Sequence, residues 1–296
     1  MDGIINVYKE RGFTSHDVVA KLRGILRQKK IGHTGTLDPE AQGVLPVCLG
    51  KGTKVCELLT DKTKTYQAVL LLGTVTDTQD TTGTVLESHP VTCTEEQVRT
   101  CINGFVGTQE QVPPMYSALK VNGKKLYELA RQGVEVERKA RTITVEEIRI
   151  DHMELPEVTI TVTCSKGTYI RTLCHDIGQA LGCGGCMKSL LRTRVGIFEL
   201  EDSITLAEIE QMRDEGTLEQ HIYAVDSVFG AYPKAVLQEE ALRLVRNGNP
   251  LAKNMLDIQA PQEGMLVRLY DDQENFLAVY AWNKDRRSYR AEKMFL

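Results

Sequence analysis

Residues 141–181, RTITVEEIRIDHMELPEVTITVTCSKGTYIRTLCHDIGQAL, decide the fold because their periodicity changes within one segment. Apolar and polar residues alternate over 141–150 and again over 157–164, which predicts two strands that pair with each other. Residues 168–181 then carry apolar residues at helical spacing and stop before Gly182, which predicts a helix. We therefore expect a fold that combines a sheet with helices.

The first 50 residues predict further elements around a Gly-rich loop. Residues 3–8 and 44–49 are expected to form strands, and residues 31–43, IGHTGTLDPEAQG, a loop. Ser15 is the expected N-cap of a helix between them. The apolar stripe of that helix is Val18, Val19, Leu22, Ile25 and Leu26, and its basic face is Lys21, Arg23, Arg27, Lys29 and Lys30. The basic face is either an ordinary solvated surface or one that meets phosphates.

Four later segments have recognisable patterns. Residues 64–73 predict a strand, and the capping box that begins at Thr94 predicts a helix to about Asn103. A further helix is expected at 205–214. Residues 111–140 are polar and irregular, and their length is typical of a functional excursion rather than of a connector.

The composition is that of a globular protein. The chain has 296 residues, of which 42% are hydrophobic and 26% are charged, and this length predicts one large domain or two. After Ala231 short apolar runs are separated by Gly and Pro, which predicts a small β-rich module with a boundary near residue 230. We expect neither a membrane span nor a signal peptide, and we expect reduced cysteines in the cytoplasm.

The net charge of −4 hides an uneven distribution. Residues 1–64 hold 11 Lys and Arg against 7 Asp and Glu, whereas residues 201–296 hold 11 against 17. A local basic patch is the footprint of phosphate binding, whatever the total charge. Charge alone leaves a nucleic-acid partner open without establishing it.

The loop GHTGTLDP, residues 32–39, is the first candidate for chemistry. Glycines let a backbone approach a ligand closely, and Pro39 pushes Asp38 into an extended conformation. A carboxylate on such a loop, with His33 beside it, can serve as a nucleophile or a base. The alternative is an ordinary turn, because Gly and Asp-Pro are common turn residues.

Two further clusters contain aromatic and basic residues. Residues 165–171, SKGTYIR, lie where a strand passes into a helix, and a helix N-terminus beside Lys and Arg suits an anion. On an extended stretch Tyr169 and Arg171 would share a face. The alternative is a capped helix start with a surface arginine. Tyr66, in a strand, is either core packing or a plate on which a base stacks.

Other motifs argue for little. Cys183 and Cys186 form a CxxC that would suit a redox pair or half of a zinc site, but no second half lies at zinc spacing and no thioredoxin-like pattern surrounds it. We treat the histidines other than His33 as incidental; they are His16, His89, His152, His175 and His221. The phosphate-binding motifs GxxxxGK[ST] and GxGxxG are absent, as are GxSxG and HExxH.

The order of these clusters resembles that of the bacterial tRNA pseudouridine-55 synthases of the TruB family. The resemblance covers residues 4–230, and its segments are GFTSHD (12–17), GHTGTLDPEAQGVLP (32–46), KTYQAVLLLG (64–73), MYSALKVNGKKLYELARQGVEV (115–136), SKGTYIRTLCHDIG (165–178) and LLRTRVG (190–196). It implies an α/β fold of the α+β type, a mixed and largely antiparallel sheet flanked by helices. The implied catalytic domain is 1–230, with an RNA-gripping insertion at about 107–140. Residues 231–296 loosely resemble the family's small PUA-like RNA-binding domain.

The resemblance also implies the activity and its residues. The reaction would isomerise uridine-55 in the TΨC loop of tRNA, with the target base flipped out, no cofactor and no metal. Asp38 would be the nucleophile. The residues implied to hold the base or the RNA loop are His33, Tyr66, Tyr169, Arg171 and Leu190. We further expect Lys9, Lys120, Lys124 and Lys125 to contact the RNA backbone of the T-arm, and the protein to be a monomer.

The chemistry explains why such residues are needed. The N1–C1′ bond breaks, the uracil turns and a C5–C1′ bond forms, so no atom is gained or lost overall. Asp38 either attacks C1′ or assists loss of the 2′ proton, and the sequence leaves both routes open. We expect Arg171 to keep Asp38 ionised by lowering its pKa by about 1–3 units. Tyr66, Tyr169 and Leu190 would exclude water and retain the detached base.

Two other functions remain as alternatives. A tRNA-binding folding factor would use the same RNA-gripping residues, with catalysis secondary. A thiol or zinc protein would act through Cys183 and Cys186. The chain also departs from the family pattern at Glu10, which stands in place of the usual proline and puts an acid near the expected path of the phosphates.

Overall fold

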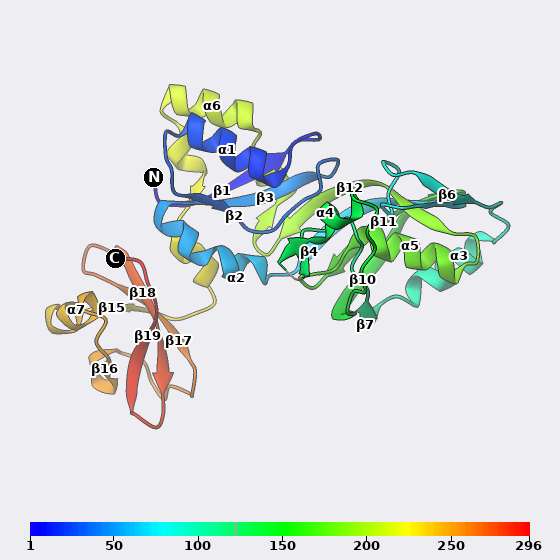
Figure 1. Ribbon diagram of the computed structural model, residues 1–296. Helices are drawn as coiled ribbons and strands as arrows, with labels where there is room; N and C mark the ends of the chain where they lie inside the picture. Colours follow the sequence, from blue (N-terminus) through cyan, green and yellow to red (C-terminus); the bar gives the residue numbers. More distant parts are fainter. Residues whose placement is uncertain (122) are drawn as a thin grey trace.

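The strands predicted at 141–164 lie within a ten-stranded sheet in the computed structural model, which describes residues 1–121 and 123–296 (Figure 1). The strand order is β14-β1-β3-β12-β4-β11-β10-β7, with β2 beside β3 and β13 beside β12. The strands are β1 (Gly3–Lys9), β2 (Ile31–His33), β3 (Gln42–Leu49), β4 (Lys64–Leu72), β7 (Gly107–Gln111), β10 (Arg141–Glu154), β11 (Glu157–Cys164), β12 (Gly185–Val195), β13 (Phe198–Glu199) and β14 (Ile222–Tyr223). Among the described strand pairs of this sheet, only β12 with β3 is parallel. The predicted mixed, largely antiparallel sheet is confirmed.

The alternation of β11 explains its place in the middle of the sheet. Val158, Ile160 and Val162 are fully buried, while the intervening threonines are half-buried. β11 pairs with β10 on one side and with β4 on the other, and Val162 lies opposite Tyr66 of β4. One apolar face of these strands is therefore available to a helix.

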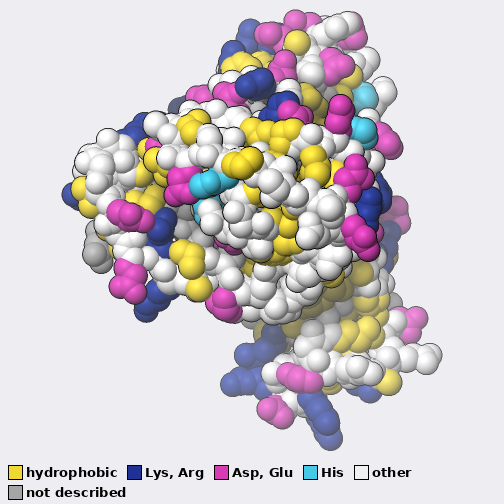
Figure 2. All heavy atoms as spheres, turned by 90° about the vertical axis from the view of Figure 1, so that its right-hand side faces the viewer, with side chains coloured by type: hydrophobic (Ala, Val, Ile, Leu, Met, Phe, Trp, Pro, Cys, Tyr) yellow, Lys and Arg dark blue, Asp and Glu magenta, His cyan; other side chains and the backbone are white. Residues whose placement is uncertain are grey.

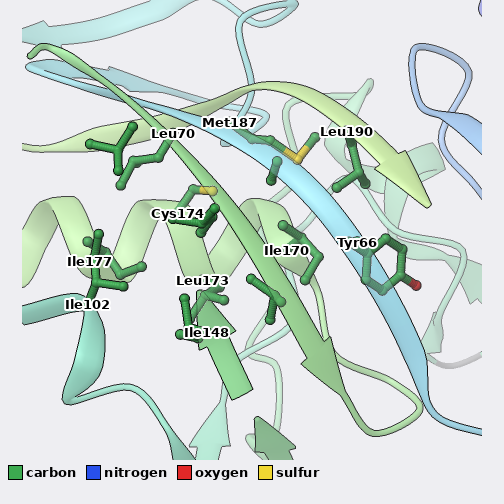
Figure 3. Packing of buried hydrophobic residues seen from close by; sticks show 14 of the residues in the cluster. Tyr66, Leu70, Ile102, Ile148, Ile170, Leu173, Cys174, Ile177, Met187 and Leu190 are labelled. Atoms are coloured by element: carbon green, nitrogen blue, oxygen red, sulfur yellow. The ribbon is translucent and has the colours of Figure 1, made fainter. Parts of the chain in front are cut away.

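Helices pack on the large sheet in two groups. The α-helices of this part are α1 (Ser15–Ile25), α2 (Cys56–Thr60), α3 (Glu95–Asn103), α5 (Ile170–Ala180) and α6 (Leu206–Glu215). α5 packs on β12 and β4, and Figure 3 shows its side chains Ile170, Leu173 and Ile177 beneath residues of those strands. α1 and α6 pack together over β1 and β3, in a separate core. Short 3-10 turns are η1 (Gly50–Val55), η2 (Leu200–Asp202), η3 (Leu218–His221), η4 (Val225–Phe229) and η5 (Lys253–Met255).

Two small hairpins extend from the large sheet. One is β5 (Thr74–Thr76) with β6 (Val85–Ser88), and the other is β8 (Lys120–Val121) with β9 (Lys124–Lys125). The second lies within the polar segment 111–140 and is followed by α4 (Leu126–Ala130). That segment is therefore partly regular, although its sequence shows no clear periodicity.

Two expectations in the first 50 residues are wrong. The N-cap of α1 is Thr14 rather than Ser15, because the Thr14 side chain accepts the Asp17 N–H in a full capping box. The Gly-rich segment 31–43 is not entirely a loop, since β2 pairs with β3 through Ile31, Gly32 and His33. A loop composition does not reveal this pairing, because its hydrogen bonds are made by the backbone.

A second sheet follows residue 230. Its order is β15-β17-β18-β19-β16, and its core includes Trp282, Tyr280 and Tyr289. Its elements are β15 (Lys234–Val236), α7 (Glu239–Arg246), β16 (Leu251–Ala252), β17 (Leu266–Tyr270), β18 (Phe276–Asn283) and β19 (Ser288–Met294). The expected small β-rich module is thus present, below the large sheet in Figure 1. Across the described residues, no helix is long and apolar enough to cross a membrane.

Candidate active site

Asp38 and Arg171 form an ion pair although 133 residues separate them in the sequence. Arg171 Nε lies 3.0 Å from Asp38 Oδ2, and Nη2 lies 3.3 Å from Oδ1, so the guanidinium engages both carboxylate oxygens. Arg171 belongs to the first turn of α5, and its side chain is 6% exposed, against 40% for that of Asp38. A buried cation therefore holds a carboxylate that solvent, or a substrate, can reach.

Arg171 also contacts two other segments, of which only the one around Thr78 and Asp80 was not indicated by the sequence. Its Nη1 donates to the Thr78 carbonyl at 3.0 Å and lies 3.6 Å from Asp80 Oδ2, while Nη2 donates to the Tyr116 carbonyl at 2.7 Å. The guanidinium thus connects the Asp38 loop, the β5–β6 hairpin and the 111–140 segment. Asp80 is a second acid at the site. The only sequence signal that could have indicated it is its place in the run of polar residues 76–83.

The electrostatics of Asp38 differ from the expectation. Burial raises the pKa of Asp38, Arg171 opposes that rise, and Asp80 adds to it. The net shift is upward, so the prediction that Arg171 lowers the pKa below its usual value is wrong. The prediction includes the effect of the guanidinium on the pKa of Asp38. It does not include the loss of hydration that burial by the surrounding segments causes, which the sequence does not show.

Lys9 does not lie on an RNA-binding surface. Its side chain is fully buried, and its Nζ donates to the carbonyls of Pro39 at 3.1 Å and Ala41 at 2.6 Å. The expectation of a phosphate contact is therefore wrong for this residue. Lys9 instead fixes the backbone just after Asp38, and the Gly12 N–H donates to the same Pro39 carbonyl at 2.9 Å.

The start of the loop is fixed from another direction. The Thr34 hydroxyl and N–H both donate to the Pro46 carbonyl, at 3.0 and 3.1 Å. Arg192, 1% exposed, donates to the carbonyls of Val44 at 2.7 Å and Gly35 at 3.4 Å. Arg192 was not among the predicted site residues, because nothing in its sequence position distinguishes a buried arginine from a surface one.

Tyr66 and Leu190 form the apolar wall of the site. Both are buried, in one cluster with Leu37 of the loop. Figure 3 shows Tyr66 at one end of this cluster, with its hydroxyl directed away from the other labelled side chains. The hydroxyl faces Arg192 on the neighbouring strand, and burial raises the pKa of Tyr66. Tyr66 is therefore packed in the core, while its role as a plate on which a base stacks stays a prediction.

Tyr169 lies at the N-cap of α5. Its backbone N–H donates to Gln111 Oε1 at 2.8 Å, and its carbonyl accepts from Gln111 Nε2 at 3.1 Å. Burial raises the pKa of Tyr169, and Asp38 adds to that rise, whereas Arg171 opposes it. Tyr169 and Arg171 converge on Asp38, but not as neighbours on an extended stretch, because the helix begins at Ile170.

His33 ends β2 beside the site. Its ring meets that of His16 edge to face, with 5.1 Å between the centroids. Burial lowers the pKa of His33, and His16 and Arg192 lower it further. His16, which we treated as incidental, therefore shapes the environment of a predicted site residue.

The three lysines of the insertion lie on the β8–β9 hairpin. Lys120 and Lys124 are exposed, and Lys125 is half-buried with its Nζ 3.2 Å from the Tyr127 hydroxyl. A cavity of about 370 Å³ separates the insertion from the body, and Asp77, Tyr116 and His175 are among its lining residues. The insertion therefore contacts the body at Tyr116 without packing closely along its whole length.

The CxxC offers no reactive thiol. Cys183 and Cys186 are both buried, and burial raises the pKa of Cys186 to about 11. A thiol with such a pKa stays protonated at neutral pH, unlike a redox-active cysteine. Within residues 1–121 and 123–296, no group of three or more His, Cys, Asp or Glu is placed to hold a metal ion.

Comparisons with known proteins agree with this geometry. Residues 23–170 match the TruB family pseudouridylate synthase N-terminal domain, and residues 171–230 match the tRNA pseudouridylate synthase B C-terminal domain. A tRNA pseudouridine synthase B of Lachnoclostridium phytofermentans is 53% identical over 100% of both chains, and one of Clostridium perfringens is 45% identical over 100% of this chain and 99% of its own.

Solved structures show the same fold. A chain from a Cbf5-Nop10-Gar1 complex matches with a TM-score of 0.75 at 30% identity, over 99% of this chain and 85% of that one. A chain from an H/ACA RNP bound to a substrate RNA matches with a TM-score of 0.74 at 28% identity, with the same coverage. Because the relatives are similar over the full length and the family model covers the Asp38 loop, the chain belongs to the TruB family of pseudouridylate synthases.

Proposed function

We propose that this protein isomerises uridine-55 in the T-arm of tRNA to pseudouridine and that Asp38 is its catalytic residue. The observation that carries the proposal is the Asp38–Arg171 ion pair beside the buried Tyr66. The curated relatives named tRNA pseudouridine synthase B support tRNA as the substrate. The proposed catalytic domain is 1–230, and the proposed RNA-binding domain is 231–296.

Asp38 acts on the ribose of the target nucleotide. It attacks C1′ or accepts the 2′ proton, and either step needs the ionised carboxylate. The N1–C1′ bond then breaks and the uracil turns. A C5–C1′ bond forms as the Asp38–C1′ bond breaks or, on the other route, as the 2′ proton is returned. The proton on C5 is then lost, and N1 gains a proton. Arg171 stabilises the charged Asp38 and holds both of its oxygens in one orientation.

The walls of the site retain the detached base. Tyr66 stacks on the uracil, and such stacking is worth about 1–3 kcal/mol per base. Tyr169 and Leu190 close the other sides and exclude water. The nucleotide must leave its stack to enter, which costs a few kcal/mol, and His33 beside the loop helps to keep the RNA open.

Contacts to the RNA backbone offset the cost of flipping. Lys120 and Lys124 are exposed on the insertion, where they can reach phosphates. The C-terminal module also presents cations, and Figure 2 shows Lys and Arg side chains at the bottom of the molecule, where that module lies. Binding that neutralises phosphates weakens steeply with added salt.

A direct assay tests the proposal. An unmodified tRNA transcript is incubated with the purified protein, and pseudouridine is mapped by chemical labelling. We expect one modified position, 55, for the wild type and none for Asp38→Asn. A transcript with cytidine at position 55 is the matched substrate control. Modification at other positions only, or equal product from Asp38→Asn, would contradict the proposal.

The same variant separates catalysis from RNA folding. A folding factor would be as effective with Asp38→Asn as without the substitution, because the RNA-gripping residues remain. The measurement is the fraction of a misfolded tRNA transcript that regains aminoacylation after incubation with each protein. Equal recovery together with normal pseudouridine formation by the wild type would assign both activities to the chain.

A further inference from the structure

Ser15 has a role other than the helix cap that its position suggests. Thr14 caps α1, whereas Ser15 is fully buried and faces the Asp38 loop. The Ser15 hydroxyl accepts the Leu37 N–H at 2.9 Å and lies 3.5 Å from the Leu37 carbonyl oxygen. A side chain from the N-terminal helix is therefore bonded to the residue immediately before Asp38.

Ser15 holds this point from the N-terminal side, whereas the Ala41 N–H donates to the Asp38 carbonyl at 3.1 Å from the C-terminal side. Pro39 follows Asp38 and has no N–H. After Asp38 the backbone is held at its carbonyls, by Lys9 and by the Gly12 N–H. Before Asp38 the backbone is held at the Leu37 N–H, which donates a hydrogen bond to the Ser15 hydroxyl. Since the Leu37 side chain is buried with Tyr66, the same contact also relates the carboxylate to the aromatic wall.

We propose that Ser15 is a positioning residue, whose hydroxyl fixes the backbone at Leu37 and thereby places Asp38 against Arg171 and the target ribose. This inference rests on the proposed function. A misplacement of about 1 Å at a reacting group can lower a rate by about a hundredfold. Removal of the hydroxyl should therefore slow the chemical step about ten- to a hundredfold. Because the hydroxyl is buried, the affinity for tRNA should stay the same.

Thr14→Ala provides a matched control for Ser15→Ala. Thr14 is the adjacent residue, and its side chain bonds within the cap of α1 rather than to the loop. Thr14→Ala therefore weakens the start of the helix that carries Ser15 but leaves the contact with the loop in place. The rate is measured in single turnover with excess protein, as release of tritium from tRNA labelled at C5 of uridine. The Kd for tRNA and the Tm are measured in parallel.

The expected result is a split between the two variants. Ser15→Ala should lose at least about tenfold in rate with an unchanged Kd, while Thr14→Ala keeps the wild-type rate at a comparable Tm. Equal rates for the two variants would overturn the inference. If Ser15→Ala does not fold, Ser15→Cys retains the volume but accepts a hydrogen bond only weakly, and it should show the same loss.

Hydrogen exchange tests the contact without any activity. In Ser15→Ala the Leu37 amide should exchange faster than in the wild type, while the amides of α1 after its first turn keep their protection. Unchanged protection at Leu37 would overturn the inference even if the rate falls. A wild type that forms no pseudouridine would instead refute the proposed function, and the exchange result would still decide whether Ser15 holds the loop.

Discussion

Replacement of Arg171 by methionine should destabilise the protein strongly and in a pH-dependent way. The substitution keeps most of the aliphatic stem but removes the guanidinium that contacts Asp38, Asp80 and the carbonyls of Thr78 and Tyr116. Removal of one partner from a buried ion pair costs about 3–5 kcal/mol. Because the Asp38 side chain is 40% exposed, water compensates part of this loss, and the lower end, about 3 kcal/mol, applies.

This loss corresponds to a measurable change in Tm. At about 2–4 °C per kcal/mol for a domain of this size, Arg171→Met should lower the Tm at pH 7 by about 6–12 °C. The difference from the wild type should shrink as the pH falls through a window above the ordinary carboxyl pKa near 4, because burial raises the pKa of Asp38 in the folded state. The reason is that Asp38, whose pKa rises further once Arg171 no longer opposes the effect of burial, then binds a proton in the folded variant and no longer needs a cation.

Thermal and urea unfolding at several pH values provide the test. Arg149→Met is the control, since Arg149 forms an exposed ion pair with Asp151 at 2.7 Å, and surface pairs contribute little. A fall in Tm of less than about 2 °C for Arg171→Met at pH 7 would refute the reasoning. So would a larger fall that does not depend on pH, because it would indicate poorer packing rather than unpaired carboxylates.

Three further predictions concern the loop and the RNA-binding surface. Asp38→Asn should lower the rate of pseudouridine formation by at least about a hundredfold, and it should raise the Tm at pH 7. Burial raises the pKa of Asp38, so the folded state disfavours the charged carboxylate, and its removal stabilises the fold. This gain in Tm should vanish as the pH falls below the pKa of Asp38 in the unfolded chain, near 4. A lower Tm of Asp38→Asn at pH 7 would contradict this prediction. Burial lowers the pKa of Lys9 to about 8, so between pH 8 and 10.5 the unfolded chain binds more protons than the folded one. The free energy of unfolding of the wild type relative to Lys9→Met should therefore rise with pH in that window. Urea unfolding that shows a constant difference between the two proteins would rule out a buried, titrating Lys9. The double variant Lys120→Ala/Lys124→Ala should reduce the slope of log Kd for tRNA against log salt concentration by about one for each phosphate that these lysines neutralise in the wild type. An unchanged slope would place both lysines away from the RNA.

The strands and most helices could be predicted because their signals are local. The alternation in 157–164 corresponds to residues that are buried and half-buried in turn along β11. The capping box at Thr94 predicts the observed helix Glu95–Asn103, with both hydrogen bonds of the box present. In these segments each residue's environment follows from its neighbours in the sequence, which a pattern can show.

Features that depend on distant partners could not be predicted in this way. Lys9 looks like a surface lysine, yet three carbonyls, among them Pro39 and Ala41, enclose its Nζ. Ser15 looks like a helix cap, yet its partner is 22 residues away. β2 lies in a segment with the composition of a loop. In each case the deciding atom belongs to a backbone that the sequence pattern does not place.

The candidate site was identified from a resemblance rather than from a pattern. Without it, two interpretations stay open for each residue. Asp38 is either a nucleophile or base or an ordinary turn residue, and Arg171 is either part of an anion site or a surface residue beside a helix cap. The structure places the two together and adds Asp80 and the Tyr116 carbonyl, to which the resemblance gave no role at the site. It also reversed the expected pKa shift of Asp38, since three segments of the chain displace more solvation than the guanidinium restores.

The contacts of Arg171 link the Asp38 carboxylate to the insertion. The Tyr116 carbonyl accepts from the same Nη2 atom that contacts Asp38 Oδ1, at 2.7 and 3.3 Å respectively. A movement of the insertion at Tyr116 therefore changes the donors available to Asp38, and a buried guanidinium that loses one acceptor must find another. We expect RNA that contacts Lys120 and Lys124 to act on this same segment. We therefore expect RNA binding and the orientation of the Asp38 carboxylate to be coupled through Arg171, so that a charge on the insertion affects the rate of the chemical step as well as the affinity.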